Sequence, residues 1–278
     1  MAVTTMTGAR PQVGAPLTTP RLPLLRQIAL LAWRNLVTIS RTPEAILPPV
    51  AISVFFLVIY QSTLGGAASF LPGLAGKSYL GFILPLSIIS SSLAGAGIAA
   101  QNLVRDLSSG YFDKLLLTPV SRAALVLGPI LAGAVILGLQ ASIVITVGLL
   151  LGLQPATGLP GLLAVIGLAV LLGTGFAGFT VSAALGSGSA AATQGAGFIF
   201  FPLTFLTASF VPLALLSGWL RTAAELNPIT YVLEAMRSLL LTGWDGELLL
   251  KGVAATLILA TAMYALAGFA LRTRTRRK

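Results

Sequence analysis

The hydrophobic residues of the chain gather in long uncharged runs that are separated by short polar segments. A helix needs about 20 apolar residues to cross the hydrocarbon core of a bilayer. Six runs approach or exceed that length, at about residues 45–64, 79–100, 123–153, 161–185, 195–216 and 252–271. The pattern therefore predicts an all-α integral membrane protein with about six transmembrane helices.

The segments outside these runs give the remaining organisation. Residues 1–20, which are rich in Thr, Pro and Gly, are expected to form a disordered cytoplasmic tail. Residues 21–44 are expected to form an amphipathic interface helix, residues 45–271 the transmembrane domain, and residues 272–278 a basic cytoplasmic tail. No stretch remains for a separate globular domain.

The interface helix is predicted from Pro23, which suits a first helical position, and from the helical periodicity of residues 24–39. Arg26, Arg34 and Arg41 fall on one side of this helix. Its apolar side consists of Leu25, Ile28, Ala32, Leu36 and Ile39. Such a basic amphipathic helix lies in the membrane interface, where it can anchor on lipid or present a docking surface to a cytoplasmic partner. Both roles stay open from the sequence.

Charge predicts the orientation of the chain. There are 17 Lys and Arg residues against 7 Asp and Glu, a formal charge of +10. With the N-terminus inside, 13 basic residues fall on the cytoplasmic side and 4 outside, as the positive-inside rule requires. We therefore expect a multi-pass protein of a cell membrane with both termini cytoplasmic. The basic ends are better explained as anchors on anionic lipid than as a nucleic-acid site.

The chain has neither Cys nor His. Thiol catalysis and disulfides are thereby excluded, and the commonest general base and metal ligand are missing. No carboxylate set suggests an active site, so we expect no enzyme activity, metal or cofactor in this chain. The predicted spans also lack ionisable residues, which disfavours a secondary transporter or channel. That class stays as the alternative, because some sodium sites use only carbonyl and hydroxyl oxygens.

The loop at residues 101–122 is long for a connection between two spans, which usually takes about two to eight residues. Gly110 lies at its centre, followed by the aromatic residues Tyr111 and Phe112, and Pro119 is a helix stop. We expect a helix, a break, a second short helix, and aromatic side chains exposed for a binding partner.

The segment between the last two spans contains a strong helix start, with Asn227 as cap and Pro228 in the first turn, and Gly243 as a stop. Glu234 and Arg237 lie opposite an apolar stripe and are close enough to pair. We predict short external helices that cap the bundle or sink partly into the outer leaflet. A site for a soluble ligand is the weaker alternative.

Small residues in the second span recur at four-residue spacing: Ser87, Ser91, Gly95 and Ala99. Small residues let transmembrane helices approach closely, so this is first a packing face. Ser87 and Ser91 are also candidates for lining a substrate path.

Two groups of residues, taken in this order, resemble the permease subunits of the ABC-transporter type-2 family, particularly the branch of bacterial daunorubicin-resistance permeases. The first group is Arg105-Asp106, Gly110, Asp113-Lys114 and residues 117–122; the second is residues 226–231 with Arg237 and Gly243. The resemblance extends over nearly the whole chain after about Leu22. Many relatives have Glu where this chain has Asp106, which keeps the charge.

The resemblance implies that the loop after the second span couples the chain to a separate ATPase subunit, with support from the interface helix. The implied coupling residues are Arg105, Asp106, Gly110, Tyr111, Phe112, Asp113, Lys114, Pro119 and Arg122. ATP and Mg would be bound by that partner, and two permeases, identical or closely related, would form a dimer. The implied function is export of a hydrophobic or amphipathic substrate, whether drug-like, lipid or lipid-linked.

Overall fold

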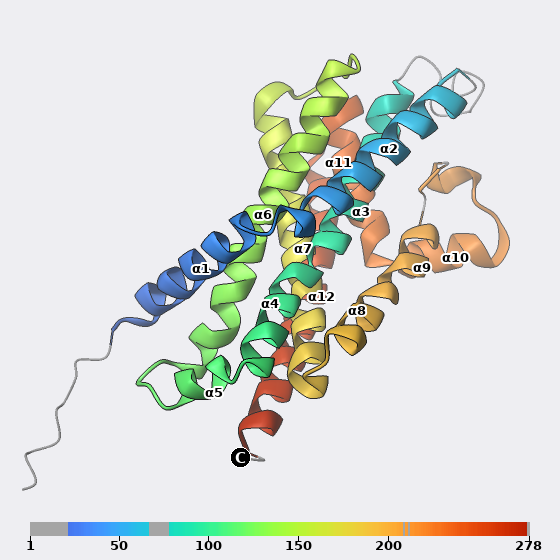
Figure 1. Ribbon diagram of the computed structural model, residues 1–278. Coiled ribbons are helices and arrows are strands. Elements are labelled where there is room, and N and C mark those ends of the chain that lie inside the picture. Colours follow the sequence, from blue (N-terminus) through green and yellow to red (C-terminus); the bar gives the residue numbers. More distant parts are fainter. Residues whose placement is uncertain (1–21, 67–77, 208, 211, 277–278) are drawn as a thin grey trace, which may run out of the picture.

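The computed structural model of the chain describes residues 22–66, 78–207, 209–210 and 212–276. Within these ranges all regular secondary structure is helical, which confirms the all-α prediction. Figure 1 shows a bundle of long helices, with α5 and the last turns of α12 at the same end. The tail predicted for residues 1–20 lies outside the described residues.

Five helical segments in the described part of the chain are long and apolar enough to cross a membrane. They are α2 (Leu47–Leu64), α3 (Tyr79–Gly95) with α4 (Gly97–Ser108), α6 (Arg122–Leu150), α7 (Gly158–Ser187) and α12 (Gly246–Arg276). Each overlaps one of the predicted spans. α12 continues beyond the predicted end of the last span, so the helix includes most of the segment expected to be a basic tail.

α7 lies at the centre of the bundle, in contact with α3, α4, α6, α8, α11 and α12. Leu137 of α6 shows how the helices approach so closely. Its two methyl groups fit against Gly95 and Gly173, where an added Cβ would lie 2.9 and 2.7 Å from them. The small-residue face predicted in the second span is therefore a packing face at Gly95.

The predicted fifth span is broken. In its place the structure has α8 (Ala190–Phe198), α9 (Phe200–Phe205), the short 3-10 helix η3 (Leu213–Leu215) and α10 (Gly218–Leu226). Pro202 has no N–H to donate to the carbonyl group of Phe198, four residues earlier, which weakens the helix at this junction. Beyond it, the side chain of Asn227 donates to the backbone oxygen atoms of Leu203 and Leu206, which favours a break, so the expectation of one continuous helix over residues 195–216 was wrong.

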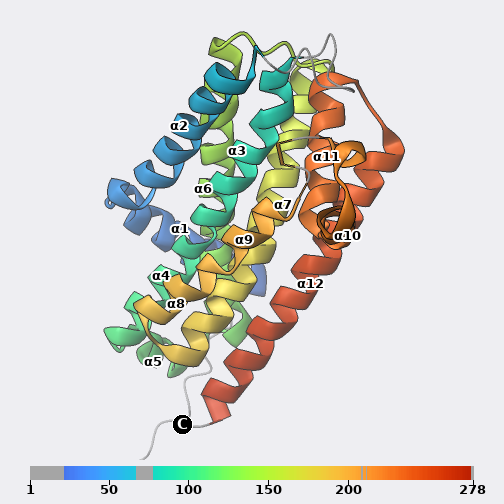
Figure 2. The ribbon, with the colours of Figure 1, turned by 90° about the vertical axis from the view of Figure 1, so that its right-hand side faces the viewer.

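α11 (Pro228–Leu241) begins and ends as predicted. Asn227 Oδ1 accepts a hydrogen bond from the backbone N–H of Ile229 at 3.0 Å. Gly243 follows the helix with a φ of 116°, a value that favours glycine. α11 packs against α3, α7 and α12 (Figure 2), and Arg237, which was expected on the polar side of this helix, is only 4% exposed.

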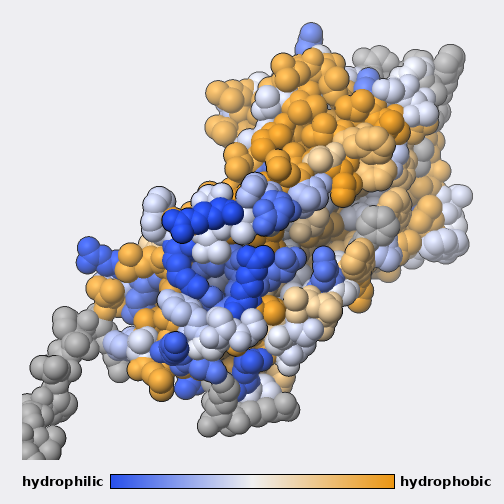
Figure 3. Space-filling view, in the orientation of Figure 1, coloured by the Kyte–Doolittle hydropathy of each residue, from blue (hydrophilic) through white to orange (hydrophobic). Residues whose placement is uncertain are grey.

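α1 (Leu24–Ser40) is the predicted amphipathic helix and runs along α6. Ala32 and Ile39 are buried in a small apolar cluster with side chains of α4 and α6, whereas Leu25 and Trp33 remain exposed. Figure 3 shows hydrophilic side chains gathered over α1, α4 and α5, while hydrophobic side chains cover the upper part of the same face. A broad exposed apolar surface of this kind is typical of a lipid-facing protein.

Candidate coupling site and membrane cavity

The interface helix is joined to the loop after the second span by one arginine. Arg34 of α1 donates two hydrogen bonds to the carboxylate of Asp106 in α4, at 2.8 and 2.5 Å. Its guanidinium carbon also lies 4.1 Å from the ring centre of Tyr111 in α5 (Tyr111–Leu116). The hydrogen bond to Asp106 raises the pKa of Arg34, so this cation stays charged. Three elements therefore meet at Arg34, and we call this group the Arg34 junction.

A second link was not anticipated from the sequence. Gln27 of α1 accepts a hydrogen bond from the backbone N–H of Ser121 at 2.7 Å, and Ser121 is the residue that precedes α6. The Gln27 amide also donates to the backbone oxygen of Leu22. A glutamine in an amphipathic helix gives no sequence signal for this role, because its partner is 94 residues away.

Gly110 separates α4 from α5. Its φ of 70° lies in the left-handed region, which glycine adopts without steric cost. This turn directs α5 back against α4, and Phe112 becomes 2% exposed within the main apolar core. The expectation that Phe112 is exposed was therefore wrong. Leu117, which follows α5, is instead 89% exposed.

The other predicted coupling residues surround this turn. Arg105, Lys114, Pro119 and Arg122 are exposed, and Asp113 and Tyr111 are half-buried. On the interface helix, Arg26 and Arg41 are exposed while Arg34 is half-buried. The structure thus brings Arg34, Asp106 and Tyr111 together and leaves the remaining basic residues at the surface.

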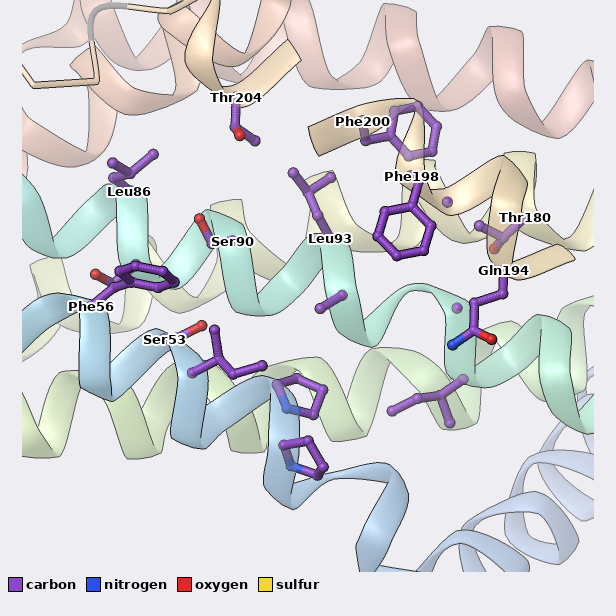
Figure 4. A pocket seen from close by; sticks show the side chains of 18 of the residues that line it. Ser53, Phe56, Leu86, Ser90, Leu93, Thr180, Gln194, Phe198, Phe200 and Thr204 are labelled. Atoms are coloured by element: carbon purple, nitrogen blue, oxygen red, sulfur yellow. The ribbon is translucent and has the colours of Figure 1, made fainter. Parts of the chain in front are cut away.

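A cavity of about 610 Å³ lies between α2, α3 and the two short helices α8 and α9. Figure 4 shows Ser53 and Phe56 facing it from α2, Ser90 and Leu93 from α3, and Phe198 from α8. Several lining side chains, such as Phe56 and Phe198, are also exposed, so the cavity opens to the surroundings on one side. Its wall is mostly apolar, with a few hydroxyl and amide groups.

The two predicted path-lining serines differ in position. Ser87 is buried and lines the cavity. Ser91 is fully buried, donates to the backbone oxygen of Ile88 at 2.8 Å, and is not part of the cavity wall. A substrate path through this cavity would therefore pass Ser87 and Ser90.

A buried arginine fixes one edge of the cavity. Arg237 donates to the backbone oxygen atoms of Phe82 at 3.0 Å and Ser209 at 2.9 Å, and to Glu234 at 3.0 Å. Its guanidinium carbon is 3.5 Å from the Phe82 ring centre. The Glu234–Arg237 pair was predicted, but its buried position was not. Because Ser209 lines the cavity, Arg237 holds part of that wall in place.

Comparison with known proteins gives the family. The family model described as "ABC-2 type transporter" matches residues 26–241. The chain belongs to the ABC-2 type transporter family. The matched range contains the Arg34 junction and every residue that lines the cavity.

Individual relatives of this ABC-2 chain include permeases with named resistance functions. The chain is 26% identical over 217 residues, 78% of each protein, to the probable doxorubicin resistance ABC transporter permease protein DrrC of Mycobacterium tuberculosis. It is 27% identical over 212 residues, 75% of this chain and 72% of the relative, to the daunorubicin resistance ABC transporter permease protein DrrB1 of Streptomyces coeruleorubidus. A putative transport permease, ycf38 of Cyanophora paradoxa, is 24% identical over 220 residues, 77% and 74% of the two chains.

Proposed function

We propose that the chain is the transmembrane subunit of an ATP-driven exporter and that a separate ATPase subunit, which binds ATP and Mg, docks at α5 on the cytoplasmic side. The observation that carries this proposal is the Arg34 junction in a chain of the ABC-2 family. A loop that only connected two spans would not need an arginine from a distant helix bonded to its carboxylate at 2.8 and 2.5 Å. The two hydrogen bonds join α1 to α4, and the cation–π contact of Arg34 with Tyr111 adds α5.

α4 supplies the route by which docking would act on the cavity. Asp106 near its end belongs to the Arg34 junction, while Gly97, Ile98 and Gln101 near its start line the cavity. At a rise of about 1.5 Å per residue, Gln101 and Asp106 are roughly 8 Å apart along the helix axis. A displacement of α5 by the ATPase would therefore move the cavity wall directly.

The substrate that suits this cavity is hydrophobic or amphipathic. Its wall combines aromatic side chains such as Phe56 and Phe198 with isolated hydroxyl groups such as Ser53 and Ser90. Small-molecule sites commonly pair a mainly apolar lining with a few polar groups that set orientation. The names of the doxorubicin and daunorubicin resistance relatives support drug-like molecules within that class.

A pair of permeases is part of the proposal. α2 exposes Ile52, Phe55 and Ile59, and it is the least buried of the long apolar helices. The cavity opens beside α2, so a second copy or close relative could complete the path there. Chemical cross-linking of the purified chain in lipid discs tests this arrangement.

Copurification tests the proposed function. The tagged chain is coexpressed with each ABC ATPase subunit of the source organism that has no transmembrane segment of its own. We expect one of them to copurify, and the complex to hydrolyse ATP while the chain alone does not. The proposal fails if no ATPase subunit associates and transport proceeds without ATP.

The orientation is tested separately with single cysteines, since the chain has none of its own. A Ser109→Cys variant should react with a membrane-impermeant thiol reagent only after the cells are opened. An Asp245→Cys variant should react in intact cells. Labelling of the first variant from outside would put α5 on the wrong side for an ATPase.

A further inference from the structure

The charge of the described cavity wall is of one sign, negative. Among the described residues that line it, Glu44 is the only carboxylate and there is no Lys or Arg, although the chain has 17 basic residues. Glu44 lies in the short turn η1 (Pro43–Ala45) just before α2, and it is exposed. It forms no hydrogen bond or ion pair with any described residue, so its carboxylate is available to a ligand.

Glu44 and the aromatic cluster of Phe56, Tyr60 and Phe210 lie toward different ends of the cavity. α2 starts beside Glu44 and runs antiparallel to α3 and α4, so Glu44 lies toward the end that contains Gln101 and Gln194. Figure 4 shows Gln194 and Phe56 on opposite sides of the view. The far end is formed by an aromatic cluster in which the ring centres of Phe56 and Tyr60 are 5.6 Å apart, and those of Tyr60 and Phe210 are 5.2 Å apart.

We propose that this cavity selects cationic amphiphiles, with the positive group at Glu44 and the apolar body against the aromatic cluster. A cation gains from the carboxylate, and a flat or branched apolar body gains from the aromatic faces. Anionic lipids and phosphate-linked substrates are disfavoured, because phosphate recognition uses Arg or Lys and the described wall offers neither. The inference rests on the proposed function, since it names the substrate class of the same exporter.

The test uses three probes that share a diphenylhexatriene body and carry a trimethylammonium group, no charged group, or a propionate group. Binding to the purified full-length chain is measured by equilibrium dialysis in a neutral detergent, with protein-free micelles subtracted. We expect the cationic probe to bind about tenfold more tightly than the anionic one, as a single nearby carboxylate would produce. Equal affinity for the three probes would overturn the proposal.

Variants assign the preference to Glu44. Glu44→Gln should weaken the cationic probe about tenfold and leave the neutral probe nearly unchanged, while Glu44→Lys should favour the anionic probe. Glu247→Gln is the matched control, because Glu247 is an exposed glutamate in the first turn of α12 and does not line the cavity. A loss of cationic preference in the control, or equal loss of neutral and cationic probes in Glu44→Gln, would contradict the assignment.

A further variant locates the binding. Ala94 lines the cavity and is exposed to it, so Ala94→Trp can fill the space without displacing the core. Both the cationic and the neutral probe should then bind less, and unchanged binding would mean that they bind elsewhere. All of these measurements use the chain without an ATPase. A failed preference therefore leaves the proposed docking intact, and failed copurification leaves the preference intact.

Discussion

Removing the charges of the Arg34 junction one at a time and together would measure how strongly α1 is joined to α4. The variants are Arg34→Gln, Asp106→Asn and the double variant. Hydrogen bonds to charged groups contribute about 1.5–3 kcal/mol, whereas exposed ion pairs contribute only about 0.2–1 kcal/mol. The side chain of Arg34 is 37% exposed and that of Asp106 is 14% exposed, so this pair lies between the two cases. We expect a coupling free energy of about 1–2 kcal/mol.

Thermal unfolding of the purified chain in detergent, followed by tryptophan fluorescence, reads out this coupling. For a protein of this size, 1 kcal/mol corresponds to a change of about 2 °C in Tm. Each single variant should therefore lower the Tm by about 2–4 °C, and the double variant should lower it by no more than the larger single effect. Arg26→Gln is the matched control on the same helix, because Arg26 is exposed and forms no ion pair with the described residues. Its Tm should stay within about 1 °C of the wild type.

Strict additivity of the two single effects would refute this reasoning, since independent residues show no coupling. A charge exchange gives a second check. Arg34→Asp and Asp106→Arg should each abolish the link, while the two together should recover part of it, because opposite charges again face each other. Tyr111→Leu should weaken the wild-type chain by about 0.5–1 kcal/mol through loss of the cation–π contact.

Three further predictions concern other parts of the site. Phe112→Ala should cost about 3–5 kcal/mol of stability and lower the yield of folded chain even without a partner, because it empties a core position. Leu117→Asp, in contrast, should leave the Tm unchanged and weaken ATPase copurification about tenfold. Arg237→Met should lose about 3–5 kcal/mol, measured as Tm, because it leaves a carboxylate and two buried backbone oxygen atoms unpaired; Arg237→Lys should recover little, since one ammonium group cannot reach all of them. Gly110→Val should lower the Tm by forcing a left-handed conformation that costs about 1–2 kcal/mol, and Gly110→Asn should be milder.

Much of the fold follows from hydrophobic run length. α2, α6, α7 and α12 each overlap an uncharged run, because a helix that crosses lipid must satisfy its own backbone hydrogen bonds over the full thickness. Local chemistry also predicts the start of α11, where Asn227 accepts from the backbone N–H of Ile229 at 3.0 Å. Both features depend on residues that are neighbours in the sequence.

The candidate site was predicted only in part, because the burial of a side chain in α5 depends on the direction that the turn at Gly110 gives to this helix. Tyr111 and Phe112 are adjacent and both aromatic, and both were expected to be exposed. Successive residues of a helix point about 100° apart, so one side of α5 cannot hold both. Once Gly110 folds α5 against α4, Phe112 enters the core and Tyr111 faces Arg34. The bond of Gln27 to Ser121 and the bonds of Arg237 to the backbone of Phe82 and Ser209 were missed, because these partners lie far away in the sequence.

The broken fifth span shows why a proline alone does not predict a break. Pro85 lies inside α3 and Pro129 inside α6, and both helices continue through them. Pro202 differs from these two prolines because side chains from another part of the chain donate hydrogen bonds to the backbone oxygen atoms that follow it. Asn227 donates to the backbone oxygen atoms of Leu203 and Leu206, at 2.7 and 3.1 Å, and Arg237 donates to that of Ser209.

These partners replace hydrogen bonds that a continuous helix would have made, and they hold the described residues of the segment after α9, 206–207 and 209–210, within the bundle. Ser209 of this segment lines the cavity, and its position depends on Arg237 of α11 rather than on helix geometry. Thr207 and Ser209 add bonds to the backbone oxygen of Thr204, at 2.7 and 2.6 Å. A wall held by side-chain bonds can shift when α11 moves against α3, whereas a continuous helix would have to unwind. We therefore expect two sides of the cavity to move during transport: α4, through the Arg34 junction, and the segment after α9, through Arg237.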